Sequence, residues 1–380
     1  MKAAVLVLSA AFLVSAAAPA HAQLGALGKI KSGADKAANA KKEVDKVRPM
    51  TEKEERALGD QTSLALRNRF GVVQDAKVTK YVTLVGSALA AASERPNLDW
   101  KFIVLDTDAV NAFAAPGGLI HVTRGLLGFA KNEAELAGVL GHEITHVTAK
   151  HTVHFIELSN RASAGTDAVG AKEGYTAEVI AKLTEQVFHR LLDNQYDQGQ
   201  EDQSDEIGVQ LANKLGYDPH GLQEVLKRLD ARNSGRNEKN GWFSSHPATK
   251  DRIVNIDKTI KKEKLASTAL VAARYKENVP YEAKPITEIA IDTSGASGLA
   301  SGDKKKEETK SADNSGKKGF GLSSIKGGTK EAQSNQQVAS AGARGVGVPD
   351  RDAKGGSNPS PVNVKVTSAD VDAFKKGIAG

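Results

Sequence analysis

The 380-residue sequence contains no cysteine. No disulfide bond can therefore form, and the fold must rest on its hydrophobic core and on any metal that it binds. The same absence restricts the ligands of such a metal to nitrogen and oxygen atoms, because thiolates are excluded.

Long hydrophobic runs are also absent after the start of the chain: none approaches the 18 apolar residues that a membrane-spanning helix needs. Residues 1–22 have the features of a secretory signal peptide, namely Lys2, an apolar stretch from Ala3 to about Ala17, and the cleavage pattern Ala20-His21-Ala22. No cysteine follows this pattern, so lipid attachment there is excluded. We expect a protein that is exported to the periplasm of a bacterial envelope and whose mature form has no transmembrane segment.

The net charge of +6 is modest and no nucleic-acid-binding motif accompanies it, so we expect no nucleic-acid partner. From about Asp292 to Pro361 the composition is dominated by Gly, Ser, Lys, Asn and Gln, and such a stretch cannot bury a core. We therefore divide the chain into a signal peptide (1–22), a linker or loose helix (23–50), one folded domain (51–291) and a mostly disordered, low-complexity tail (292–380). Within the tail, Thr367 to Ile378 has the pattern of one short helix.

The most informative motif is His142-Glu143-Ile144-Thr145-His146. It lies in a segment that the sequence predicts to be a helix, from Asn132 to about His151, because Asn132 is a suitable N-cap and apolar residues follow at helical spacing. On such a helix His142 and His146 are one turn apart on the same face, so both imidazoles can reach one metal ion. Glu143 falls on the adjacent flank, where it can accept a proton from a water on that metal. The alternative is a pair of surface histidines on an amphipathic helix.

A third metal ligand must come from elsewhere in the chain. His151 and His154 lie off the ligand face of the helix, so we predict structural or surface roles for both. Glu201 is the best candidate, because Glu201 and Asp205 are i,i+4 neighbours that lead a small, apolar helix face. Glu201 as ligand and Asp205 as hydrogen-bond acceptor for a ligand imidazole would account for this pattern. The alternative is a solvated acidic face.

The elements before the motif predict how a peptide is held. Two helices are expected, from Thr51 to Gly71 and from Lys77 to Ala92, followed by strands at 99–106 and 119–123. An exposed edge of this sheet beside the metal can bind an extended peptide by strand addition. Asn111 and Ala112, next to the sheet, are our candidates for the backbone-binding rim.

Two further segments bear on catalysis. His246 lies in the turn Ser244–Pro247. It can donate a hydrogen bond to the oxyanion of a tetrahedral intermediate, or it can occupy and block the fourth position on the metal. The alternative is that it is only a structural residue of the turn. Arg252 can reinforce the oxyanion role. Residues 163–174 are rich in Gly and Ala and form either a lid over the cleft or a plain connector.

Together these residues resemble the M48 (Ste24/HtpX-like) family of zinc metallopeptidases, from about Thr51 to Lys258. The blocks that carry the resemblance are Asn111–Gly118, Val122–Leu127, Glu201-x-x-x-Asp205, and Ser245-His246-Pro247 with Arg252 after it. The resemblance implies a gluzincin with one Zn²⁺ per chain on His142, His146 and Glu201, and with Glu143 as the base. The expected fold is a mainly helical α+β zincin-like domain with a small sheet.

The expected function is that of a zinc-dependent endopeptidase that hydrolyses exported, unfolded or misassembled envelope polypeptides. The competing hypothesis is a zinc-stabilised periplasmic chaperone or assembly factor whose protease activity is latent or secondary. A non-peptidase zinc hydrolase is disfavoured, because the block Asn111–Gly118 resembles a peptide-binding rim.

Overall fold

The computed structural model describes residues 49–162, 175–193, 196–233, 246, 249–285 and 358–378. The predicted signal peptide, the linker, the segment 163–174 and the tail from 292 to 357 lie outside these residues. Residues 49–159 and the described residues from Tyr175 onward belong to one compact unit, which holds every contact discussed below.

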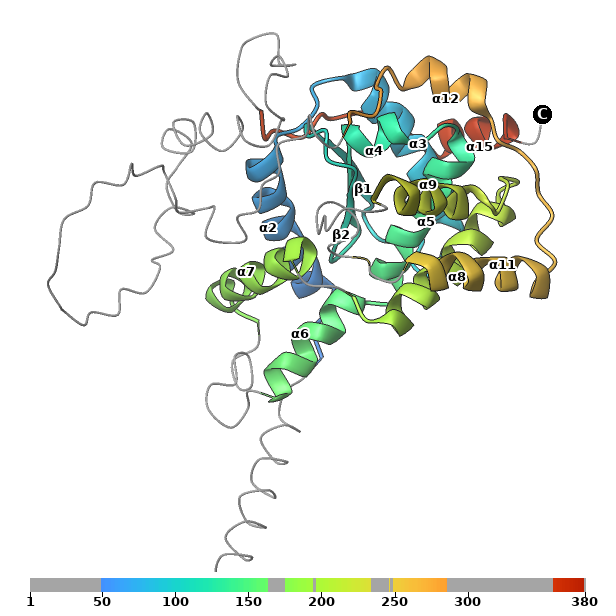
Figure 1. Cartoon of the computed structure of the whole chain (residues 1–380). Helices are drawn as coiled ribbons and strands as arrows, with labels where there is room; N and C mark the ends of the chain where they lie inside the picture. Colours follow the sequence, from blue (N-terminus) through green and yellow to red (C-terminus); the bar gives the residue numbers. More distant parts are fainter. Residues whose placement is uncertain are drawn as a thin grey trace, which may run out of the picture. The chain divides into compact units, whose positions relative to one another are not determined.

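This unit is mainly helical and contains a small three-stranded sheet, as predicted (Figure 1). In chain order its elements are α2 (Glu52–Phe70), α3 (Ala76–Ala92), β1 (Lys101–Leu105), β2 (Ala112–Ala115), β3 (Leu119–Thr123), α4 (Arg124–Phe129), α5 (Glu133–Thr148), α6 (His151–Ala162), α7 (Ala177–Asp193), α8 (Gln198–Lys214), α9 (Gly221–Asn233), α11 (Thr249–Lys262), α12 (Ala272–Asn278) and α15 (Ser368–Lys376).

The sheet has the strand order β1-β3-β2. β1 and β3 run parallel, from Lys101↔Leu119 to Leu105↔Thr123, and β2 pairs antiparallel with β3. The sequence predicted β1 and β3 but not β2, whose four residues are all buried and therefore lack the alternation that marks a half-exposed strand. β2 lies at one edge of the sheet and packs against α5.

Local sequence signals explain the ends of several helices. Thr51 and Glu54 form a capping box at the start of α2, and Gly71, where the helix was predicted to end, is its C-cap. α3 begins one residue before the predicted Lys77 and is capped by Asp75. The predicted short helix near the C-terminus is confirmed as α15, with Thr367 as its N-cap.

The motif helix is shorter than predicted. α5 ends at Thr148 instead of continuing to about His151, with Ala149 as its C-cap. Lys150 then takes a positive φ of 56°, a left-handed conformation that a continuing α-helix cannot contain. A new helix, α6, begins at His151. His151 therefore does not lie on the motif helix, and the chain is redirected between them.

The start of α5 is fixed by a buried carboxylate. Glu133, the first residue of α5, is fully buried and accepts hydrogen bonds from Tyr81 Oη at 2.7 Å and Tyr217 Oη at 2.6 Å. Arg274 from α12 forms an ion pair with it, and the Arg274 guanidinium lies 4.1 Å above the ring of Phe374 in α15. A buried charge needs such partners, so this group ties α3, α8–α9 and α12 to the first turn of the motif helix.

The C-terminal residues 358–378 pack on the domain, although they fall within the predicted tail. Val371, Phe374 and Ile378 are buried in the same core cluster as the apolar residues of α5. Asn358 O accepts a hydrogen bond from Val72 N at 2.7 Å. The apolar residues that return after Pro361 provide the hydrophobic surface that the preceding low-complexity stretch lacks.

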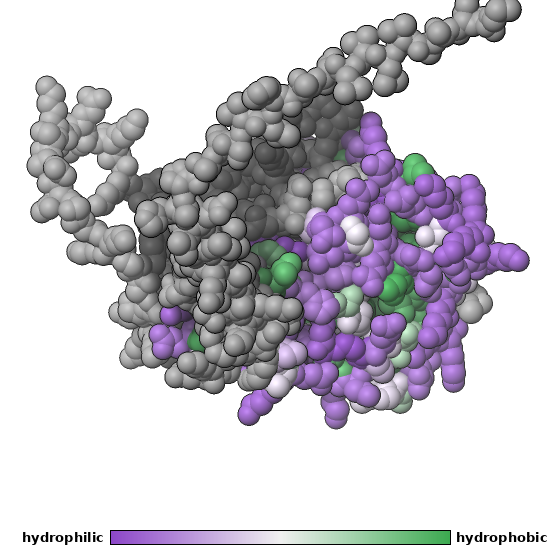
Figure 2. All heavy atoms as spheres, turned by 90° about the horizontal axis from the view of Figure 1, so that it is seen from below, coloured by the Kyte–Doolittle hydropathy of each residue, from purple (hydrophilic) through white to green (hydrophobic). Residues whose placement is uncertain are grey.

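On the face shown in Figure 2 the described surface is largely hydrophilic. Only three large apolar side chains among the described residues are exposed, namely Leu158, Val254 and Leu270. None of the described helices combines the length and apolar character needed to cross a bilayer.

α5 and α8 approach each other backbone to backbone. A Cβ atom on Gly208 of α8 would lie 2.7 Å from His142 N, and one on Gly141 of α5 would lie 2.8 Å from Gly208 O. Only glycine at both positions permits this approach, because either Cβ would clash with backbone of the other helix. The acidic residues of α8 are thereby brought against the histidines of α5.

The variant Gly208→Ala tests this contact between α5 and α8. The added methyl group pushes α8 away from α5, so we expect a loss of about 1–3 kcal/mol in the free energy of unfolding and weaker metal binding. Urea unfolding and zinc titration measure the two effects. Gly199→Ala in the same helix is the matched control, because its Cβ would meet only the Asp197 side chain, at 3.3 Å. Equal stability and zinc affinity for the two variants would contradict the packing argument.

His121 is a buried titratable residue of the sheet. Its ring is fully buried in β3, and Nε2 lies 2.9 Å from Ser63 Oγ of α2. Burial, reinforced by the charge of Arg67, lowers the pKa of His121 to about 3. The ring therefore stays neutral in the folded protein above about pH 3.

This burial predicts a pH-dependent stability. The unfolded chain takes up a proton at His121 below pH about 6.5, whereas the folded protein does not until about pH 3, so stability falls as pH drops through this range. One such proton corresponds to a slope of about 1.4 kcal/mol per pH unit. We expect His121→Gln to have a lower free energy of unfolding at pH 7.5. Between pH 6 and 4 this free energy should depend less steeply on pH than in the wild type, by the amount that one proton contributes. Urea unfolding measures both quantities. A slope identical to that of the wild type would contradict this origin.

Candidate metal centre

The contact between α5 and α8 brings the three predicted ligands together. His142 Nε2 and His146 Nε2 lie 3.0 Å apart. Glu201 Oε2 is 3.7 Å from the first of these nitrogens and Glu201 Oε1 is 3.5 Å from the second. All three side chains are fully buried. Glu201 thus meets two histidines that precede it by 59 and 55 positions in the chain, as the sequence predicted.

His246 joins this group from the described position between α9 and α11. Its Nδ1 lies 2.7 Å from Glu201 Oε1 and 3.2 Å from His142 Nε2. One ligand atom from each of His142, His146, Glu201 and His246 lies within 4.8 Å of the others. Of the roles left open for His246, this position agrees directly with that of a fourth metal ligand.

The chemistry of these atoms fits a divalent cation. Burial lowers the pKa of His146 well below its ordinary value, so its imidazole is neutral. Ring nitrogens of three histidines and a carboxylate oxygen then converge in a buried space, an arrangement of lone pairs that a cation stabilises. Nitrogen and oxygen donors in this number match the tetrahedral preference of Zn²⁺.

Asp205 and Arg252 support the ligands from behind. Asp205 Oδ1 accepts a hydrogen bond from His142 Nδ1 at 2.8 Å, which leaves His142 Nε2 with its lone pair toward the ligand group. Arg252 Nε and Nη2 each lie 2.7 Å from an oxygen of Asp205, and Nη1 lies 2.7 Å from Glu201 Oε2. The Arg252 guanidinium therefore contacts two carboxylates, a position different from the oxyanion-facing one considered from sequence.

Paired charges keep both carboxylates ionised despite burial. Burial acts to raise the pKa of Asp205, but the charge and hydrogen bonds of Arg252 outweigh it and hold the pKa below its ordinary value. Burial also opposes ionisation of Glu201, and His246 and Arg252 together hold the pKa of this carboxyl well below its usual range. An anionic oxygen is the form in which a carboxylate binds a metal.

Glu143 lies beside the ligand group without being part of it. The side chain is buried, and its Oε1 is 3.6 Å from His246 Nε2. This is the flank on which the helical spacing placed it. A carboxylate in this position can exchange a proton with a group that reacts at the metal.

Sequence reasoning missed two residues that touch His146. His151 Nδ1 lies 2.9 Å from His146 Nδ1, because the turn at Lys150 brings the start of α6 behind the ligand. The ring of Tyr196, just before α8, lies 3.9 Å from that of His146 between centroids. Tyr196 Oη is 3.1 Å from Thr152 Oγ1. The position of His151 depends on the end of α5 at Thr148, which the apolar periodicity of the sequence did not indicate. No pattern in the sequence indicated a role for Tyr196.

The predicted peptide-binding rim lies at the start of β2. Asn111 is buried, and its Oδ1 accepts a hydrogen bond from Ala112 N at 2.8 Å. Asn111 N donates to Thr123 Oγ1, which fixes this end of β2 to the end of β3. Toward the other end of β2, Ala114 and the following Pro116 line a small cavity together with His146.

The sequence is also similar to those of known proteins. The sequence pattern of peptidase family M48 matches residues 76–260. A putative beta-barrel assembly-enhancing protease of Vibrio cholerae is 27% identical over 215 residues, which cover 54% of this chain and 44% of that protein. The mitochondrial metalloendopeptidase OMA1 of Schizosaccharomyces pombe is 30% identical over 183 residues, or 47% of this chain and 52% of that protein. Metalloprotease YcaL of Escherichia coli is 27% identical over 183 residues, which cover 48% of this chain and 70% of that protein.

The match thus spans about half the length of the first two relatives. It covers the helices α5 and α8 and the position of His246, so every residue of the buried ligand group lies within the family pattern. The resemblance inferred from the motifs is confirmed. The chain belongs to peptidase family M48, and its buried group of His142, His146, Glu201 and His246 is the metal-binding group of a metallopeptidase.

Proposed function

We propose that the protein is a zinc-dependent endopeptidase that cleaves exported, unfolded or misassembled polypeptides of the bacterial envelope. The observation that carries this proposal is the convergence of His142, His146 and Glu201 on one point, with the carboxylate of Glu143 alongside. A structural metal site has no need of the second, uncoordinated carboxylate.

One Zn²⁺ per chain would be held by His142, His146 and Glu201. Bound there, the metal supplies Lewis-acid activation of water and of the scissile carbonyl. Asp205 orients His142, and Arg252 holds Asp205 and Glu201 in place through the contacts described above. This buried support restricts the ligand side chains to a single arrangement.

Glu143 acts as the general base and then as the acid. Its carboxylate takes a proton from the attacking water and passes it to the leaving amine. The buried position of Glu143 keeps bulk water from competing for that proton.

His246 is assigned two successive roles. Among the ligand atoms it holds the place that an incoming carbonyl oxygen needs, so it blocks the centre while no substrate is bound. Once displaced, its ring can donate a hydrogen bond to the oxyanion, the catalytic role inferred from sequence.

The substrate would lie as an added strand along β2, with Asn111 and Ala112 at one end of the binding rim. The position of β2 at the edge of the sheet and against α5 supports this placement. The signal-peptide pattern supports export, and relatives named beta-barrel assembly-enhancing protease support an envelope substrate. Their name also supports the alternative of an assembly factor with secondary protease activity.

Glu143→Gln separates chemistry from metal binding. We expect cleavage of casein to fall by about 10²- to 10⁴-fold, because the amide cannot accept the proton, while zinc content stays at that of the wild type. Product release and elemental analysis measure the two quantities. Glu178→Gln, at an exposed position of α7, is the matched control and should behave as the wild type. Full activity of Glu143→Gln would exclude Glu143 as the general base. If this variant kept its full cellular function without cleaving protein, the alternative of an assembly factor would be favoured.

Asp205→Asn tests the support of His142. The neutral amide accepts more weakly from His142 Nδ1 and removes one of the two carboxylates that Arg252 contacts, so we expect zinc affinity to fall about 10- to 100-fold. Competition with a chromophoric chelator gives the affinity. Asp202→Asn on the same helix should leave it unchanged, because Asp202 contacts Asn255 and no ligand. Equal affinities for both variants would remove Asp205 from the proposed centre.

A further inference from the structure

His146 has a partner on the side away from the ligand group, as His142 has in Asp205. His146 Nδ1 lies 2.9 Å from His151 Nδ1, and His151 Nε2 lies 3.0 Å from Gln203 Oε1 on α8. Both histidines are buried, whereas Gln203 lies at the surface. A chain of hydrogen bonds therefore runs from the surface of α8 through α6 to the second motif histidine.

The position of each proton in this chain of hydrogen bonds follows from the Gln203 amide at its surface end. An amide oxygen only accepts, so His151 Nε2 carries the proton that is donated to Gln203 Oε1. A neutral imidazole has one N–H, so His151 Nδ1 is an acceptor and His146 Nδ1 donates to it. His146 Nε2 is then unprotonated and faces His142 Nε2 at 3.0 Å, as a metal ligand must.

The opposite assignment is incompatible with a metal site. If the Gln203 amide nitrogen donated to His151 Nε2, His151 Nδ1 would carry the proton and donate to His146 Nδ1. His146 Nε2 would then hold a proton directed into the ligand group, where it would repel a cation. The first assignment alone makes His146 a ligand.

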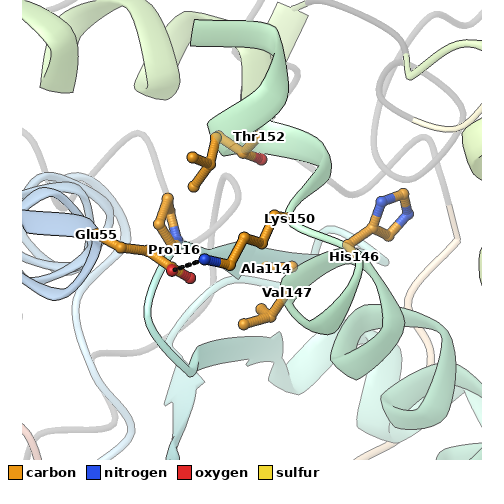
Figure 3. A pocket seen from close by; sticks show the side chains of 8 residues that line it. Glu55, Ala114, Pro116, His146, Val147, Lys150 and Thr152 are labelled. Carbon is orange, nitrogen blue, oxygen red and sulfur yellow. Dashed lines mark ion pairs between the residues drawn. The ribbon is translucent and has the colours of Figure 1, made fainter. Parts of the chain in front are cut away.

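The turn between α5 and α6 holds His151 in this position. Lys150 Nζ lies 3.4 Å from Oε2 of the buried Glu55, and Figure 3 shows this ion pair beside the turn of α5 that carries His146. Arg95 donates to Glu55 at 2.8 Å and to Val147 O at 3.2 Å. The end of α5 is thus attached to α2, and the left-handed Lys150 directs the next residue back onto His146.

We propose that His151 is a positioning residue of the metal centre: it fixes the tautomer and orientation of His146 through a relay that ends at Gln203. The two ligand imidazoles of α5 then have different supports, a charged carboxylate behind His142 and a neutral imidazole behind His146. The inference rests on the proposed metal role of His146. It adds a residue outside the H-E-x-x-H motif to the zinc-binding machinery.

The test compares His151→Asn with His151→Leu. Asn places an acceptor oxygen near the position of His151 Nδ1, whereas Leu offers none, so we expect zinc affinity to fall about 10- to 100-fold for Leu and to be largely retained for Asn. Chelator competition measures the affinity, and the visible spectrum of the Co²⁺-loaded protein reports the ligand geometry independently of activity. Equal losses for Asn and Leu, or no loss for Leu, would overturn the proposal.

Gln203 provides a second test that does not disturb the core. Gln203→Leu leaves the His151 tautomer unfixed, so affinity should fall several-fold in the wild-type background and be unchanged in the His151→Leu background. Gln210→Leu, further along α8, is the matched control and should have no effect in either background. An effect of Gln203→Leu that persists without His151 would exclude the relay. Failure of the wild type to bind Zn²⁺ or Co²⁺ would instead refute the metal centre itself.

Discussion

The contact between α5 and α8 is the constraint on which the site depends. Gly141 and Gly208 let the two backbones approach more closely than any side chain would allow. Glu201 and Asp205 are therefore within reach of His142 and His146, and none of the four can move far, because each is buried. A site built on two packed helices is held more precisely than one built on loops, which suits a metal with strict geometry.

The cost of burying these charges is offset locally. Two carboxylates and one guanidinium are removed from water, and such charges are tolerated only when each has close partners of opposite sign. Arg252 contacts both Asp205 and Glu201, and the remaining negative charge is balanced when a divalent cation binds among the imidazoles. The metal thus completes an ion-pair network that the protein alone leaves with an excess of negative charge.

Both ends of α5 are also anchored by buried glutamates that form ion pairs with arginines. Glu133 at its start is held by Arg274, which stacks on Phe374 of the C-terminal helix α15. Glu55 at its end holds Lys150 and Arg95. The last described residues of the chain therefore contribute to the same scaffold as the motif, although residues 286–357 separate them in sequence from the rest of the domain.

The sequence by itself determined the family, the H-E-x-x-H pair and the acidic ligand Glu201 with Asp205, because i,i+4 spacing on a helix fixes which side chains share a face. It also determined the starts of α2, α5 and α15, through the local capping residues Thr51, Asn132 and Thr367. Only the tertiary structure decided that Arg252 lies on two carboxylates, that His246 reaches the ligand atoms and that His151 lies behind His146. These contacts join segments whose relative positions follow from packing and from one left-handed residue, Lys150, which periodicity along the chain cannot encode.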